Sequence, residues 1–145
     1  IYRALVEATA FGAKMIIDRV REYGVPVDQV INCGGLAGKS PFLMQTYADI
    51  LDMPMTVSAS DQTCALGAAL FGAVAADVFT DVASAQGKLC RIREQAYQPI
   101  PANVPVYREL FALYRQVHDG FGTAAWCGQM SNVMKDLIAI RERQR

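Results

Sequence analysis

Hydrophobic positions in the first part of the chain follow first helical and then extended spacing. Over residues 1–23 apolar side chains recur at helical intervals, which predicts an amphipathic helix that ends at Gly24. The run 29–33 is short, is β-branched at its centre and leads into two adjacent glycines. It therefore predicts a buried strand followed by a tight loop.

The next segment repeats this alternation. Ser-Pro is a favourable cap and first position, and it predicts a helix over 40–53. A second short strand is expected over 55–58. Ser60 or Asp61 is then expected to cap a third helix, rich in small residues, that ends near residue 78.

Helices that alternate with strands in this way are typical of crossover units on a parallel sheet, so the fold class is α/β. Two short strands with several covering helices fall below the usual sheet of about 4 to 6 strands. We therefore expect the remaining strands to come from outside this chain or from a second copy, with an open edge that favours homo-oligomers. Beyond residue 78 the pattern predicts helices near 81–89, over 106–118 and over 124–145, with a polar link at 98–105.

Composition narrows the class of protein. The chain has 145 residues, 52% of them hydrophobic, which is enough for one domain with a core. Lys plus Arg number 14 and Asp plus Glu number 14, so we expect no nucleic-acid partner. The longest apolar run, 64–76, is shorter than the roughly 17–25 residues of a membrane span, and we expect a buried helix there. Because helical spacing begins at Ile1, we expect a piece of a longer protein.

The cysteines give no metal or redox signal. Cys33, Cys64, Cys90 and Cys127 are widely spaced, and His118 is the one histidine. A zinc cluster or a dithiol motif needs closer spacing. We expect small, buried, free thiols in a cytoplasmic protein.

The segment from Cys33 to Ser40 carries the most informative chemistry. It lies between a predicted strand and a predicted helix, where parallel α/β folds bind ligands and where a helix start favours phosphate. Gly34 and Gly35 would let a nucleotide approach the backbone, because no Cβ stands in the way and positive φ is available. We interpret the segment as a nucleotide-contact loop. A turn that binds nothing is the alternative, since such turns are common in crossover units.

A phosphate-binding P-loop is a poorer interpretation of the same segment. It requires a glycine where Cys33 stands, and Gly34 is one residue too close. Pro41 also removes a backbone donor from the start of the helix. Ser40 is better explained as a helix cap than as a ligand contact.

Other polar and aromatic residues have simple structural explanations. Asp61 is expected to cap a helix rather than act as a catalytic acid, because no partner lies nearby in the sequence. Glu7 is expected to be a solvated helix charge, and His118 a residue at a surface helix end. Helical spacing favours core packing for the aromatic series and for Trp126 over base stacking (Tyr107, Phe111, Tyr114).

The double-glycine segment, the following Gln-Thr-Tyr-Ala-Asp-Ile-Leu at 45–51 and the Ala-Leu-Gly-Ala-Ala at 65–69 together resemble the FGGY family of carbohydrate kinases. The resemblance implies a fold, that of an actin-like ATPase (ribonuclease-H-like) domain. It places residues 1–145 in the C-terminal half of the second kinase domain, with a nucleotide-side core at 1–78 and C-terminal helices at 79–145. The stretches 3–14 and 59–69 are most similar to members that phosphorylate a ketopentose, L-ribulose.

The resemblance also implies roles for particular residues. Gly34 and Gly35 would pack against the adenosine and nearby phosphate of ATP, and Lys39 or Ser40 would face the adenine. Mg²⁺ would accompany the ATP. The phosphate loop and the catalytic Asp would belong to the N-terminal kinase domain, the implied partner, so this chain alone would be inactive.

Two alternatives remain. Another kinase of the family, acting on xylulose or glycerol, would share the double-glycine segment. From a different class, the chain could be a non-enzymatic module that associates with itself through the open sheet edge.

Overall fold

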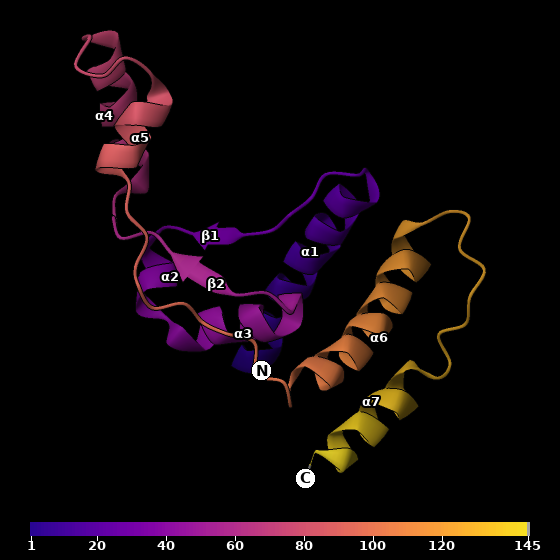
Figure 1. The fold of residues 1–145 in the computed structure, drawn as a ribbon. Coiled ribbons are helices and arrows are strands. Elements are labelled where there is room, and N and C mark those ends of the chain that lie inside the picture. The colour runs from indigo at the N-terminus through magenta and orange to yellow at the C-terminus, as the bar shows by residue number, and fades with distance from the viewer. Residues whose placement is uncertain (145) are drawn as a thin grey trace.

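The computed structural model describes residues 1–144 as a mixed assembly of helices with one small sheet (Figure 1). The elements in chain order are α1 (Tyr2–Glu22), β1 (Val30–Asn32), α2 (Gly35–Lys39), α3 (Pro41–Leu51), β2 (Met55–Val57), α4 (Thr63–Ala75), α5 (Val82–Leu89), α6 (Val104–Gly122) and α7 (Val133–Arg143).

The sheet confirms the predicted parallel crossover. β1 and β2 pair in parallel, with Val30 opposite Met55 and Asn32 opposite Val57. On the far side of β2, Tyr97 pairs with Met55 in an antiparallel bridge. Within residues 1–144, β1 has β2 as its one neighbour, so its outer edge is open.

Two hydrophobic clusters hold the body of the molecule together. The first gathers around α3 and β2, where Met44 and Met55 are fully buried. The second joins three helices, since Phe11 of α1 and Ile50 of α3 pack with Phe111 of α6. The aromatic series predicted to form core, Tyr107, Phe111 and Tyr114, belongs to this second cluster. Together the clusters fix α3 between α1 and α6.

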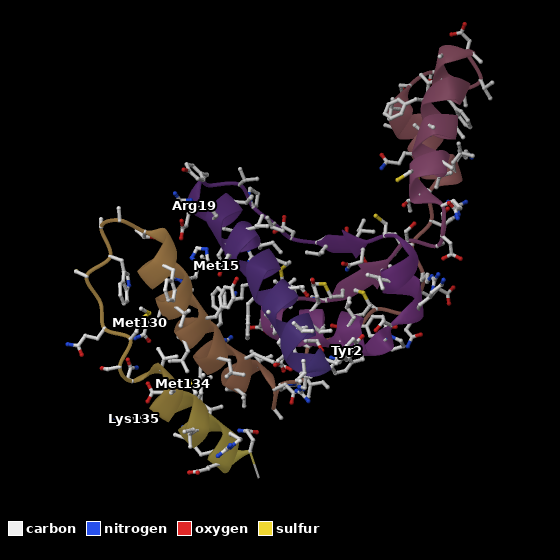
Figure 2. All side chains as sticks on the ribbon, turned by 180° about the vertical axis from the view of Figure 1, so that it is seen from behind. Tyr2, Met15, Arg19, Met130, Met134 and Lys135 are labelled. Atoms are coloured by element: carbon white, nitrogen blue, oxygen red, sulfur yellow. The ribbon has the colours of Figure 1, made fainter. Side chains whose placement is uncertain are left out.

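The helical pair α4–α5 forms an arm that projects away from this body (Figure 1). The prediction of a buried small-residue helix is wrong for this chain: Leu70 is the one buried residue of α4, and Phe71 is 62% exposed. A methyl group added at Gly67 or Gly72 would meet no atom within 4 Å. Seen from behind, the side chains of the arm stand clear of the body (Figure 2). Small residues permit a close approach, but among the described elements the main packing partner of α4 is α5.

Several predicted details of the helices need correction. The glycine segment is not all loop, because Gly35–Lys39 forms the short helix α2. Neither Ser60 nor Asp61 caps α4: Gln62 occupies the N-cap position without a side-chain hydrogen bond. Ser60 Oγ instead accepts from the Gln62 backbone N–H at 3.2 Å, forming a local turn.

The C-terminal segment differs from its prediction in where helix begins. Residues 124–132 are irregular and helix starts at Val133. A methyl group at Gly128 would lie 2.5 Å from the Trp126 ring, so the backbone folds tightly over the indole there. Trp126 thus packs on glycine rather than in the core. No helix within residues 1–144 is both long enough and apolar enough to cross a membrane.

The cysteine prediction holds in one respect and fails in another. The four thiols are free, as expected. Cys33, Cys64 and Cys127 are nevertheless exposed rather than buried. Cys33 lies past the end of β1 and Cys64 lies on the uncovered arm, so neither position has a core to enter.

Candidate nucleotide-binding site

The candidate site begins where β1 ends. Gly34 has φ 91° and ψ 171°, a backbone conformation that is essentially restricted to glycine. This turn carries the chain from β1 directly into α2. Gly34 therefore uses the positive φ that is available to a glycine, as the sequence indicated.

Side chains of both strands fix the place where this turn starts. Asn32 Nδ2 donates to the Thr56 carbonyl at 3.2 Å, and Thr56 Oγ1 donates to the Val30 carbonyl at 3.0 Å. The Ser58 N–H donates to the Asn32 carbonyl at 2.8 Å. Gly34 therefore follows a strand end that is held from the neighbouring strand.

The backbone of both glycines is open to the outside. A methyl group at Gly34 or Gly35 would meet no atom within 4 Å. The segment therefore leaves room for a planar or extended ligand to lie directly on the main chain.

The two polar candidates of this segment have different surroundings. The Ser40 hydroxyl accepts from the Leu43 N–H at 3.3 Å and so caps α3, as predicted. Lys39 is the last residue of α2 and is exposed. The Lys39 ammonium is thus available to an incoming ligand, whereas the Ser40 hydroxyl is used to cap α3.

One pair of charged residues beside the glycine segment was not found from the sequence. Arg93 Nη2 lies 2.9 Å from Asp61 Oδ1. A methyl group at Gly38 would lie 3.2 Å from that Nη2 atom. The two residues are 32 positions apart and belong to no recognisable motif, so no local signal marks them.

Glu7 lies elsewhere and is not the solvated charge that was predicted. Its Oε1 accepts from Arg3 Nε at 2.8 Å and from the Tyr107 hydroxyl at 3.0 Å. Burial, as the main cause, raises the pKa of Tyr107 above its ordinary value, and the Arg3 hydrogen bond partly opposes it. This cluster joins α1 to α6 and is a structural contact between helices.

His118 also lies outside the candidate site. Its Nδ1 is 3.0 Å from Asp119 Oδ1, and its ring stacks on Tyr114 with centroids 6.1 Å apart. Across residues 1–144, no group of three or more His, Cys, Asp or Glu side chains could hold a metal ion. The glycine segment therefore offers an incoming ligand open backbone and one exposed ammonium group.

Comparison with known proteins gives the family. Residues 1–76 match the model of the FGGY family of carbohydrate kinases, C-terminal domain. The chain is 41% identical to the ribulokinase of Bacillus licheniformis over 99% of its own length and 26% of that protein. It is 46% identical to the ribulokinase of Mycolicibacterium smegmatis over 97% of its length and 24% of that protein. The chain thus spans about a quarter of these relatives.

Solved structures give the same fold. The gluconate kinase of Lactobacillus acidophilus superposes on 83% of the chain and 24% of that protein, with a TM-score of 0.68 and 22% identity. The xylulose kinase of Rhodospirillum rubrum superposes on 82% of the chain and 24% of that protein, with a TM-score of 0.66 and 25% identity. The predicted actin-like ATPase fold is confirmed, and the chain belongs to the FGGY family of carbohydrate kinases, within the C-terminal domain of that family.

Proposed function

We propose that this chain forms the adenosine side of the nucleotide site in an ATP-dependent sugar kinase. The observation that carries the proposal is the geometry of Gly34 and Gly35. Gly34 has a conformation essentially restricted to glycine and lies at the end of a parallel strand, and the backbone that follows it is open. The chain also belongs to a family of kinases. Ligands of parallel α/β folds bind at this end of the strands.

Within the site, adenosine and the nearest phosphate would lie against the Gly34–Gly35 backbone. Lys39 would supply a flexible positive charge from the end of α2. Ser40 would act indirectly, by capping α3 and so holding the end of the segment in place. Mg²⁺ does not fit a site on residues 1–144, so we assign its protein ligands to the rest of the kinase.

The proposed acceptor is a ketopentose, L-ribulose. The support is the name of the curated relatives, ribulokinase, at 41–46% identity. Kinases of xylulose and gluconate among the structural neighbours make another sugar of the family the second candidate. The phosphoryl transfer itself would depend on the N-terminal kinase domain, which would supply the carboxylate that activates the sugar hydroxyl.

The rest of the kinase is also the proposed partner of two uncovered surfaces. The outer edge of β1 has unpaired backbone groups, and α4 exposes apolar side chains such as Phe71. Both features are costly in water and favour association. The proposed division of the chain follows: residues 1–78 carry the nucleotide segment, and residues 79–145 support it through α6, whose Phe111 packs on Phe11 of α1.

Substitution of Gly35 in the full-length kinase tests the nucleotide assignment. A valine there would stand where the nucleotide lies, yet meet little of the protein, since a methyl group at Gly35 has no neighbour within 4 Å. We expect Gly35→Val to raise KM for ATP much more than KM for the sugar. Gly122→Val is the matched control, because Gly122 is equally open but lies at the end of α6. Equal changes in both KM values would count against an adenosine-side role.

Association through β1 distinguishes this proposal from the self-association module. If pairing through β1 were the function of the chain, Ile31→Pro should abolish oligomers of the full-length kinase and leave its KM for ATP unchanged, because Ile31 lies on β1 and is 50% exposed. Under the kinase proposal, the isolated chain should self-associate in sedimentation experiments, whereas the full-length kinase need not.

A further inference from the structure

The arm α4–α5 is closed at its base by an ion pair. Asp61 lies just before α4, and Arg93 follows α5. Arg93 Nη2 donates to Asp61 Oδ1 at 2.9 Å, so the two ends of the arm are joined where it leaves the body. The orientation of the arm and the position of this pair are therefore linked.

The backbone around Arg93 is held by β2. The Arg93 N–H donates to the Val57 carbonyl at 2.9 Å, and the Ala59 N–H donates to the Arg91 carbonyl at 2.9 Å. Ser58 lies opposite Ile92 in an antiparallel bridge. The guanidinium thus extends from a fixed point at the end of the sheet, not from a free loop.

The pair lies directly on the glycine segment. A methyl group at Gly38, the residue before the last of α2, would be 3.2 Å from Arg93 Nη2 and 3.5 Å from Asp61 Oδ1. The first separation is tighter than ordinary contacts, so the absence of a Cβ at Gly38 lets the pair rest on the helix backbone. α2 begins at Gly35, so one side of the proposed nucleotide contact is supported by this pair.

We propose that Asp61 and Arg93 are positioning residues for the nucleotide site. The pair holds α2 at a fixed distance from the end of β2, and with it the backbone of Gly34 and Gly35. This inference rests on the proposed function and adds two residues that the glycine motif does not contain. The side chains of Asp61 and Arg93 are 75% and 39% exposed, and ion pairs at such exposure contribute little to stability. Their effect is therefore on the geometry of the site rather than on folding.

Kinetics of the full-length kinase test this role. We expect Arg93→Ala and Asp61→Asn each to raise KM for ATP about five-fold, with kcat and KM for the sugar unchanged. This pattern is expected when an interaction stabilises the bound ground state and the transition state equally. Arg91→Ala is the matched control, because its guanidinium contacts the Gly87 and Cys90 carbonyls instead. We expect that control to leave KM for ATP unchanged.

Exchange of the two charges makes the test specific to the pair. The double variant Asp61→Arg with Arg93→Asp restores an ion pair, so we expect KM for ATP to return to within about two-fold of the original value. The proposal is overturned if Arg93→Ala and Asp61→Asn leave KM for ATP unchanged, or if only one of them changes it. If those results are obtained while Gly35→Val selectively raises KM for ATP, the positioning role of the pair is overturned and the proposed function stands. A Gly35→Val variant that affects both substrates equally would instead overturn the proposed function.

Discussion

The carboxylate of Asp49 is expected to be a main determinant of how α6 docks on the body. Asp49 lies on α3 and is 3% exposed. Its Oδ1 accepts from Gln45 Nε2 and from the Ile100 N–H, both at 2.8 Å, and its Oδ2 accepts from Asn103 Nδ2 at 2.7 Å. One buried side chain therefore fixes the segment that leads into α6.

The expected cost of removing this carboxylate follows from its partners. A hydrogen bond to a charged group contributes roughly 1.5–3 kcal/mol, and its loss leaves buried donors unpaired. The Ile100 N–H and the Asn103 amide would lose their acceptor in Asp49→Ala. Leaving these two donors unpaired costs about 1–3 kcal/mol each, or roughly 2–6 kcal/mol together. We expect a loss near the lower end, about 3 kcal/mol, because water can reach the freed donors: Ile100 is 42% exposed, and Gln45 and Asn103 are partly exposed.

Urea unfolding of the chain measures this loss. With a dependence on urea of about 1–3 kcal/mol per molar, a loss of about 3 kcal/mol lowers the midpoint by about 1–3 M. Asp52→Asn is the matched control on the same helix end. Asp52 is half exposed, pairs with Arg108 at 2.7 Å and has φ 53°, a conformation that asparagine also tolerates. We expect that control to change stability by less than about 1 kcal/mol. Equal midpoints for Asp49→Ala and Asp52→Asn would show that the Asp49 carboxylate stabilises the fold no more than the exposed Asp52 carboxylate does.

Three further substitutions have definite expected outcomes. Gly34→Ala forces a side chain into φ 91° and ψ 171°, so thermal unfolding should show a loss of about 1–3 kcal/mol; an unchanged melting temperature would contradict that backbone conformation. Ser40→Ala removes the cap of α3 and should cost about 1 kcal/mol in urea unfolding; an unchanged unfolding midpoint would contradict the cap. The raised pKa of buried Tyr107 means that the unfolded tyrosine ionises first, so stability is present below about pH 10 and falls as pH rises above it. Tyr107→Phe should make this fall shallower in melting temperatures measured between pH 8 and 11, and an unchanged slope would argue against the assignment.

Local spacing was enough to predict most elements of the body, although not the short helix α2. The parallel strands, α1 and α3 follow from apolar periodicity and from helix-start and helix-end signals, because each depends on neighbours within a few residues. The adjacent glycines made positive φ available at the end of the first strand, and Gly34 adopts it.

Features set by distant contacts could not be predicted in this way. Two of the three partners of Asp49 lie 51 and 54 positions away, and Arg93 meets Asp61 across 32 positions. The apolar composition of α4 predicted a buried helix, yet within residues 1–144 Leu70 is its one buried residue. Composition could not indicate that the main packing partner of α4 among the described elements is α5. The periodicity of apolar residues therefore does not predict buried polar networks or surfaces shared with other chain segments.

Photo-cross-linking of the full-length kinase with 8-azido-ATP measures where the adenine lies. We expect peptide mapping to find label on residues 33–40, and we expect excess ATP to prevent that label. Leu36 and Lys39 follow Gly35 on α2 and have exposed side chains that can take the label. ATP-protected label found elsewhere, with none on residues 33–40, would show that the adenine binds away from this segment.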